Sequence, residues 1–231
     1  MISSLLFTFI ACNPDPGEIS ETVGYRTGED ESSGERGTVQ ITEVLWSGSV
    51  NNDGTRDPND NFIELRNTGD GPVNLSGWQL QISGEVNRTL IIPTSDVMLD
   101  VGEHGFLAAK DTGCFPNPTW VVSELEFGKG DAFQVTIRDQ DERLIEPIGS
   151  TSMPPFAGGY DLVTSRSMER IELMFGGAGT SPSSWHFYTP AEVDTPNDTN
   201  VAESCKNLTH ASPGLPNSPD YSGSYATGSF E

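Results

Sequence analysis

The residues best suited to chemistry lie in one polar loop, Ser49–Asp60, whose side chains resemble the oxygen ligands of a calcium site. Polar residues alternate along it as they do in the EF-hand loop, and Gly54 stands where that loop turns sharply. Ser49 replaces the usual first Asp and Asp60 replaces the usual final Glu, and both changes weaken a site. The candidate ligands are Asn51, Asp53, Thr55, Asp57 and Asp60.

This loop has two interpretations. Hard oxygen atoms at alternating positions hold Ca²⁺ with about millimolar affinity in extracellular modules. Asn, Asp and Gly are also the residues that turns use, so the same residues suit a strand connection without metal. Calcium is therefore a candidate ligand, and no other cofactor is predicted.

The sequence contains none of the short motifs of common catalytic sites, neither HExxH, GxSxG, a P-loop nor a dinucleotide fingerprint. The histidines His104, His186 and His210 are scattered along the chain, which favours structural or surface roles over catalysis. Paired carboxylates are common, but a chain with 34 acidic residues produces them by chance. The sequence therefore predicts a protein that is not an enzyme.

The first residues, 1–12, resemble a bacterial lipoprotein signal peptide. An apolar run from Leu5 to Ala11 ends in a small residue before Cys12, which would carry the lipid. Phe9 stands where Leu is usual, and no Lys or Arg precedes the run, so a misassigned start or an ordinary short secretion signal are the alternatives. The run is too short to cross a membrane, which takes roughly 20 apolar residues. The predicted location is the bacterial cell envelope, as a membrane-anchored lipoprotein on the outer membrane, its periplasmic side or the surface, or outside the cell.

The other two cysteines, Cys114 and Cys205, form an even pair in a compartment that tolerates disulfides. A bridge would tie a loop in mid-domain to the C-terminal segment. The alternative is two separate thiols, since neither cysteine has a CxxC or zinc-type partner nearby.

The formal net charge of -22 argues against a nucleic-acid partner, because phosphate backbones are bound by clustered cations. No run rich in Lys and Arg exists in the chain. The predicted partners are an envelope protein or another surface ligand, and a membrane through the lipid anchor.

The middle of the chain has the pattern of a β-sandwich. Polar and apolar residues alternate with period two in Gln79–Ile82 and Phe133–Ile137, as in half-buried antiparallel strands. Short strands at this spacing, separated by Gly- and Asp-rich turns, predict an all-β, immunoglobulin-like sandwich. The predicted strands are Val39–Trp46, Phe62–Asn67, Trp78–Ser83, Thr89–Ile92, His104–Ala109, Ala132–Arg138 and Leu144–Pro147.

Both flanks differ from this pattern. Residues 13–37 are rich in Pro, Gly, Ser and acidic groups, so they predict a flexible acidic linker that cannot bury enough apolar surface to fold. Residues 218–231 are rich in Ser, Gly and Tyr and predict a loose tail. One domain, 38–217, is predicted between them.

Within this domain, the motifs resemble those of lamin-tail domains. An I-x-E-V strand begins at Ile41, an F-I-E-L-x-N strand at Phe62 and an L-S-G-W-x-L turn at Leu75. Later segments resemble the remaining turns and the closing segment of that family: Leu99–His104, Gly130–Val135, Ser167–Arg170, Trp185 and Ser212–Asn217.

The resemblance implies an immunoglobulin-like sandwich, found in bacteria on secreted or membrane-attached proteins with no assigned chemistry. Animal members belong to filaments and bind partners or nucleic acid, but this chain has neither a heptad rod nor a basic surface. The shared residues have structural roles: Gly77 takes a tight turn, Trp78 fills the core, and Glu64 and Asn67 satisfy loop backbone.

The sequence thus predicts a non-enzymatic envelope lipoprotein whose lamin-tail domain acts in protein binding, adhesion or scaffolding, with calcium as a candidate stabiliser. The alternative is an accessory domain of an extracellular hydrolase or nuclease system, because lamin-tail domains elsewhere accompany such enzymes. No second domain with motifs of its own supports that alternative here.

Overall fold

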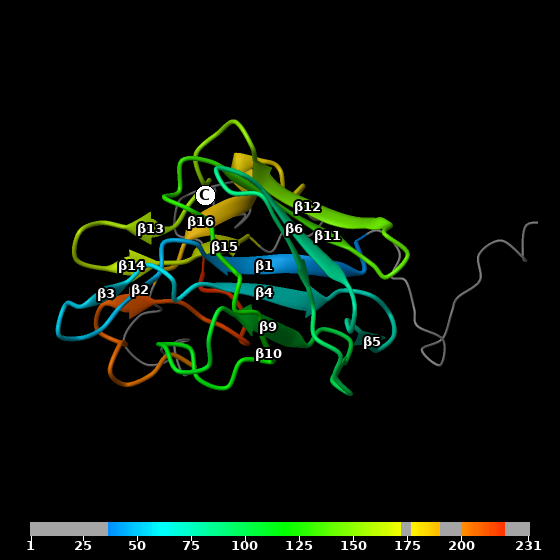
Figure 1. Cartoon of the computed structure of the whole chain (residues 1–231), viewed down its shortest axis with the longest axis horizontal. Helices are drawn as coiled ribbons and strands as arrows, with labels where there is room; N and C mark the ends of the chain where they lie inside the picture. The colour runs from blue at the N-terminus through cyan, green and yellow to red at the C-terminus, as the bar shows by residue number, and fades with distance from the viewer. Residues whose placement is uncertain (1–36, 172–176, 190–199, 220–231) are drawn as a thin grey trace, which may run out of the picture.

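The computed structural model describes residues 37–171, 177–189 and 200–219, which form a β-sandwich (Figure 1). The only helix in these ranges is a short 3-10 turn, η1 (Pro182–Ser184), so none of their helices is long and apolar enough to cross a membrane. The predicted signal peptide and the predicted linker, apart from Gly37, lie outside the described residues. So do residues 220–231 of the predicted tail.

The larger sheet contains six strands, with the long strand β1 inside it between two antiparallel neighbours. The remaining pairs are also antiparallel, except for the parallel pair at one edge. The spatial order is β10 (Trp120–Val121), β9 (His104–Ala108), β4 (Phe62–Asn67), β1 (Val39–Leu45), β15 (Met168–Arg170) and β16 (Trp185–Phe187).

The smaller sheet contains four antiparallel strands and packs against one face of the larger sheet. We call that face of the larger sheet its inner face and the opposite one its outer face. The spatial order of the smaller sheet is β12 (Leu144–Ser150), β11 (Phe133–Arg138), β6 (Gln79–Gly84) and β7 (Arg88–Ile91).

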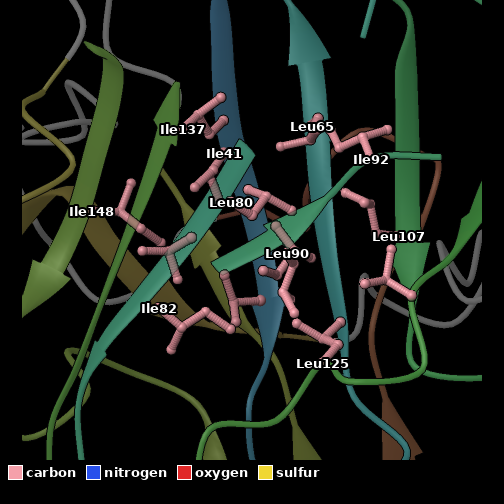
Figure 2. Close-up of a cluster of buried hydrophobic side chains, with 14 of the residues drawn as sticks. Ile41, Leu65, Leu80, Ile82, Leu90, Ile92, Leu107, Leu125, Ile137 and Ile148 are labelled. Atoms are coloured by element: carbon pink, nitrogen blue, oxygen red, sulfur yellow. The ribbon is translucent and has the colours of Figure 1, made fainter. Parts of the chain in front are cut away.

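The main core lies between these sheets, where aliphatic side chains from both interdigitate (Figure 2). Their burial follows from the period-two pattern, because every second residue of each strand points to the same face. Fully burying one such side chain contributes about 1.5–3 kcal/mol. Those fully buried include Ile41, Leu65 and Leu107 from the larger sheet and Leu80, Ile82, Ile137 and Ile148 from the smaller sheet.

Three small sheets complete the fold in the described ranges. They pair short segments whose sequences carry no alternation, so sequence reasoning did not predict them. They are β2 (Ser49–Val50) with β3 (Arg56–Asp57), β5 (Val73–Asn74) with β8 (Met98–Leu99), and β13 (Gly159–Tyr160) with β14 (Ser165–Arg166) and β17 (Thr209–His210).

The L-S-G-W turn that begins at Leu75 has the conformation that its residue types predict. Gly77 has a φ of +77°, a left-handed conformation that suits glycine, and its N–H donates to the carbonyl of Ile92. Trp78 is fully buried in the main core. Asn67 donates from its side chain to the carbonyls of Gly71 and Leu99, which confirms its predicted role in satisfying loop backbone.

A β-bulge in β1 breaks the strict alternation of that strand. The register with β4 shifts between Ile41 and Glu43. In a regular strand these two residues would face the same side, but the extra residue of a bulge reverses the alternation that follows it. Ile41 and Val44 therefore both lie in the main core, and Glu43 lies on the outer face.

A C-terminal segment covers the outer face. We call residues Ala211–Ser218 the C-terminal cover. Next to it lies a second apolar cluster, in which Phe62 packs edge-on against Phe106 and Phe115. The cluster contains Leu45, Phe62, Phe106, Ala108, Cys114, Phe115, Val201, Cys205 and Ala211. Ser218 is buried, so the folded region extends one residue past the predicted boundary at Asn217.

The seven strands that alternation predicts are all present with small shifts at their ends. The largest shift is in β12, which continues from the predicted end at Pro147 to Ser150. The all-β, immunoglobulin-like sandwich is therefore confirmed.

Candidate functional site

The loop that resembles a calcium site forms a β-hairpin between β2 and β3. The N–H of Asn51 donates to the carbonyl of Thr55 (2.9 Å), and the N–H of Gly54 donates to the carbonyl of Asn51 (2.8 Å). The carboxylate of Asp53 accepts the Thr55 N–H (2.8 Å). That backbone hydrogen bond stabilises the charged form and lowers the pKa of Asp53.

Asp57, at the end of β3, forms an ion pair with Lys110 and accepts the N–H of Asn59 (3.1 Å). Partial burial opposes ionisation of Asp57, but these two donors outweigh it and lower the pKa of the carboxyl. The Asp57 carboxylate is thus already paired with a cationic group of the protein, the Lys110 ammonium.

Asp60 is almost fully buried. Its Oδ2 accepts the hydroxyl of Ser49 (2.6 Å) and the N–H of Cys114 (2.7 Å), whereas no hydrogen-bond partner reaches Oδ1 among the described residues. Burial raises the pKa of Asp60. Gly113 lies directly over the carboxylate, because a Cβ at this position would stand 2.1 Å from Oδ1.

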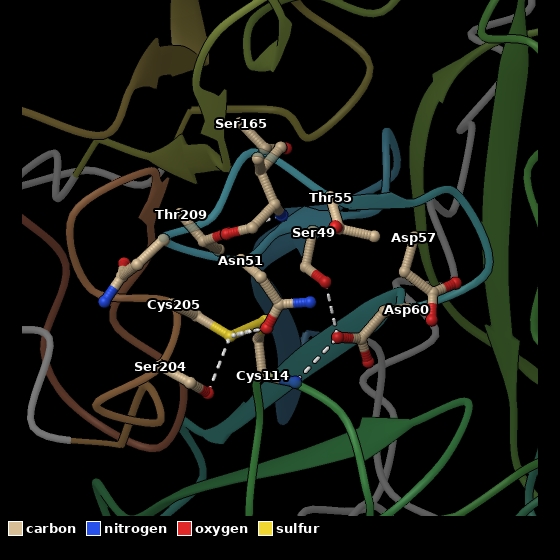
Figure 3. Close-up of a disulfide and its surroundings, with 12 residues drawn as sticks. Ser49, Asn51, Thr55, Asp57, Asp60, Cys114, Ser165, Ser204, Cys205 and Thr209 are labelled. Carbon is tan, nitrogen blue, oxygen red and sulfur yellow. Dashed lines mark hydrogen bonds between the residues drawn. A yellow bond between two sulfur atoms is a disulfide. The ribbon is translucent and has the colours of Figure 1, made fainter.

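A disulfide joins Cys114 to Cys205, with the Cα atoms 5.7 Å apart (Figure 3), as the sequence predicted. The Oδ1 of Asn51 points toward it and lies 3.3 Å from the Sγ of Cys205. Asn52 extends the attachment, since its N–H donates to the carbonyl of Ser204 (2.6 Å) and its Oδ1 accepts the N–H of Asn207 (3.0 Å). The hairpin tip is therefore tied to the C-terminal segment at several points.

The hairpin β13–β14 lies beside this structure. The Arg56 guanidinium stands over the Tyr160 ring, 4.4 Å from its centroid. The Ser165 hydroxyl donates to the carbonyl of Gly48 (2.5 Å), and β14 continues into a parallel pair with β17. Thr209 of β17 in turn accepts the N–H of Val50 (2.7 Å).

The tip of β13–β14 presents apolar side chains to solvent. Leu162 is 83% exposed and Val163 is 60% exposed. Leu162 has a φ of +78°, which is rare for a bulky residue. Asp161 holds this conformation by accepting the N–H groups of Thr164 (2.7 Å) and Val163 (3.0 Å), and these bonds lower the pKa of Asp161.

We call the two hairpins and the disulfide the loop end of the sandwich. In Figure 1 the loop end is on the left, whereas the start of β1 near residue 38 is on the right. The chain therefore enters the sandwich at the end opposite the two hairpins. Any segment that precedes residue 37 joins the sandwich at the far end from the loop end.

Four of the five predicted calcium ligands lie on the β2–β3 hairpin and Asp60 follows it, but the five contact different groups. Asn51 points toward the disulfide, Asp53 closes the turn, and Asp57 pairs with Lys110. Thr55 is an exposed turn residue, and Asp60 anchors the segment around Cys114. Among the described residues, no group of three His, Cys, Asp or Glu side chains could hold a metal ion. Calcium binding stays a prediction, and Cys12 lies outside the described residues.

The three histidines lie away from the tips of the hairpins β2–β3 and β13–β14, and each contacts another side chain. Nδ1 of His104 lies 2.8 Å from Glu64, and Nε2 of His186 lies 3.8 Å from Glu169. His210 stacks on Tyr188.

Sequence reasoning missed Asp161 and Leu162 at the tip of β13–β14. An Asp whose side chain accepts the N–H groups two and three residues later is a signal for this type of turn.

The two stacked sheets define the class of protein, an all-β, immunoglobulin-like domain. A sequence model of the family described as the Lamin Tail Domain matches residues 32–151, just over half of the chain. The chain therefore belongs to the lamin tail domain family, as its motifs predicted. No curated protein matches the chain.

Proposed function

We propose that the protein is a non-enzymatic lipoprotein of the bacterial cell envelope that binds a surface partner in adhesion or scaffolding. The observation that carries this proposal is the loop end, where a disulfide and the Asp161 turn hold two hairpins rigidly at the opposite end from the start of β1. A linker anchored through Cys12 would present that end away from the membrane.

Recognition would use the apolar tip of β13–β14. Rigid exposed side chains make good anchors, because little conformational entropy is lost when a partner covers them. The partner is expected to offer an apolar pocket for Leu162 and Val163. Its rim is expected to be basic, because the chain carries a net charge of -22.

Binding of the labelled full chain to envelope preparations of the producing cells tests this proposal. The double substitution Leu162→Ser and Val163→Ser is expected to weaken binding by about tenfold or more. Ile91→Ser is the matched control, because Ile91 is an exposed aliphatic residue (52%) on the edge strand β7. Equal binding by both variants contradicts a role of the tip.

Mass spectrometry of the mature N-terminus tests the location. An acylated Cys12 supports the anchored form, and an intact Met1 contradicts it. Phosphodiesterase activity in the purified chain would instead favour the alternative, an accessory to an extracellular nuclease.

Calcium binding at the Ser49–Asp60 loop is a secondary proposal, favoured by one observation. The Oδ1 of Asp60 is buried and accepts no hydrogen bond from the part of the chain that the structure describes. An unpaired buried oxygen of this kind is costly unless a cation or water reaches it. Calorimetry is expected to show Ca²⁺ binding by the full chain and by Asp70→Asn, a control outside the loop, but not by Asp60→Asn. Absence of heat and of any change in melting temperature removes this proposal.

A further inference from the structure

Three glutamates form a row across the outer face of the larger sheet. Glu169 of β15 pairs in register with Glu43 of β1, and Glu43 pairs with Glu64 of β4. All three side chains are fully buried. Adjacent carboxylates removed from water cannot all stay ionised without a large cost in free energy. We call these residues the acid row.

The C-terminal cover lies on the acid row and donates hydrogen bonds to each of its three carboxyl groups. The N–H of Ser212 donates to Glu43 Oε1 (2.9 Å), and the N–H of Gly214 donates to Glu64 Oε2 (2.7 Å). The N–H of Ser218 donates to Glu169 Oε2 (3.1 Å). The cover itself contains no charged residue. It therefore meets the row with neutral donors.

The hydroxyl of Ser212 shows where a proton must be. Its Oγ lies 3.2 Å from Glu43 Oε2 and 2.6 Å from Glu169 Oε1. A hydroxyl has one hydrogen, so it donates to only one of these two oxygens. The other hydrogen bond exists only if the carboxyl group on that side carries a proton and donates to Oγ.

The remaining contacts assign this proton to Glu43. Both oxygens of Glu169 already accept from Ser218, through its N–H and its hydroxyl. The Ser218 hydroxyl accepts the N–H of Thr189 (2.8 Å), so its own hydrogen is directed to Glu169. The chain of bonds is complete when Glu43 donates to Ser212 Oγ and Ser212 Oγ donates to Glu169.

Other titratable or charged groups surround the row. His104 of β9 contacts Glu64, and His186 of β16 lies near Glu169. Arg66 follows Glu64 on the outer face of β4, and His210 precedes the cover in the chain. On the inner face, Arg170 forms an ion pair with Glu146 beneath the same strands.

We propose that the C-terminal cover is a proton-controlled latch, closed on the acid row while Glu43 is protonated and released from Ser212 onward when Glu43 loses its proton. Release stops at the disulfide, because Cys205 stays joined to Cys114. Opening would expose the acid row, and the main core between the sheets would stay intact.

The direction of the pH effect follows from the burial of the row. Burial, together with the charges of Glu169 and Glu64, raises the pKa of Glu43 well above its usual range. Burial also raises the pKa of Glu169 to about 7. The closed form therefore holds a proton that the open form releases, and rising pH favours opening.

Hydrogen exchange of the Ser212, Gly214 and Ser218 amides in the full chain measures the latch directly. After correction for intrinsic exchange rates, protection in the wild type is expected to fall by up to about tenfold per pH unit as pH rises from 4.5, the ordinary pKa of Glu, through the raised pKa of Glu43. Amides of β6 and β11 are expected to keep their protection over the same range.

Two substitutions distinguish a pH-controlled latch from an acid row that only stabilises the fold. The amide of Glu43→Gln accepts with one atom and donates with the other, like protonated Glu43, so the cover is expected to stay closed at all pH values. Glu64→Met removes the oxygen that accepts the Gly214 N–H while keeping a side chain of similar length, so the cover is expected to loosen at all pH values. If Glu43→Gln loosens the cover as Glu64→Met does, or if wild-type protection does not change with pH, the proposal is wrong.

Infrared spectroscopy provides a test that does not depend on opening. The wild type at neutral pH is expected to show the carbonyl band of a protonated carboxylic acid. The band is expected to be weaker in Glu43→Gln, where only other buried acids such as Glu169, with a pKa of about 7, can contribute to it. A wild-type spectrum identical to that of Glu43→Gln in this region would place no proton on Glu43 and would overturn the latch.

Discussion

The two faces of the larger sheet are built on different principles. Apart from the buried ion pair between Arg170 and Glu146, the inner face meets the smaller sheet through aliphatic and aromatic side chains, and the main core lies between them (Figure 2). The outer face meets the C-terminal cover through the acid row and a set of directed hydrogen bonds. A disulfide ties down the segment that precedes the cover (Figure 3). One sheet therefore separates an apolar interface from a polar one.

This difference determines how each face responds to conditions. Burial of apolar surface is non-directional and depends little on pH or redox state. The hydrogen bonds of the outer face depend on which carboxyl group holds a proton, and its covalent bond depends on an oxidising environment. We therefore expect the inner face to set the global stability and the outer face to respond to the surroundings.

The largest effect is expected from the inner face. Leu65→Ala removes a fully buried side chain from the main core and is expected to lower the free energy of unfolding by about 2–5 kcal/mol. Urea unfolding monitored by tryptophan fluorescence measures this change. Ile91→Ala, on the exposed side of β7, is the control and should change little. A loss below about 1 kcal/mol at Leu65 would contradict the division between the faces.

The disulfide is expected to have the next largest effect. Cys114→Ser combined with Cys205→Ser should lower the free energy of unfolding by about 2–4 kcal/mol, because the bridge closes a long loop in the unfolded chain. Faster hydrogen exchange is expected in residues 200–218, next to the outer face. Reduced wild-type protein should behave in the same way, and unchanged exchange in this segment would argue against the bridge as a tie for the cover.

Stability is expected to fall as pH rises. Burial raises the pKa of Glu43 and Glu169 in the folded protein, so the folded chain binds protons that the unfolded chain has released. This stabilisation is complete below about pH 4.5 and is lost as pH rises to about 7 and beyond, at up to about 1.4 kcal/mol per proton for each pH unit. The exposed groups with lowered pKa, such as Asp53 and Asp161, act only at more acidic pH.

Urea unfolding at several pH values measures this dependence. The slope should be shallower in Glu43→Gln, which cannot titrate at that position. A free energy of unfolding that increases between about pH 5 and about pH 7 would contradict the assignment of protons to the outer face.

The smallest effect is expected at the exposed ion pair beside the loop end. Lys110→Ala removes the partner of Asp57, but both side chains are about a third exposed and screened by water. The expected loss in the free energy of unfolding is below about 1 kcal/mol and should shrink further in high salt. A larger loss would show that polar contacts near the outer face stabilise the fold as strongly as the main core.

Alternation was enough to predict the two main sheets. Pairs such as Leu80 and Ile82, or Val135 and Ile137, repeat with the strand period and lie in the core as expected. Trp78 and Gly77 could also be assigned, because a tight turn and a large apolar residue each allow few environments. The short strands such as β13 and β17 could not be predicted, since their pairing depends on contacts between distant segments.

The acid row could not be predicted from the sequence, for two physical reasons. The bulge after Ile41 reverses the alternation of β1, so the sequence pattern assigns Glu43 to the wrong face. Its burial also depends on a segment about 170 residues away, whose Ser, Pro and Gly residues show no period. At the loop end, residue types left open a calcium loop or a plain strand connection, and they could not show that Asp57 would form an ion pair with Lys110.

The position of β1 in the larger sheet has a practical consequence for choosing where to end a shortened chain. The match to the family ends at Thr151, but β15 and β16 come later in the sequence. A protein cut at Thr151 would leave β1 as an open sheet edge with unsatisfied amide and carbonyl groups, which is a known route to aggregation. Expression of a soluble, monodisperse sample should therefore extend past Ser218.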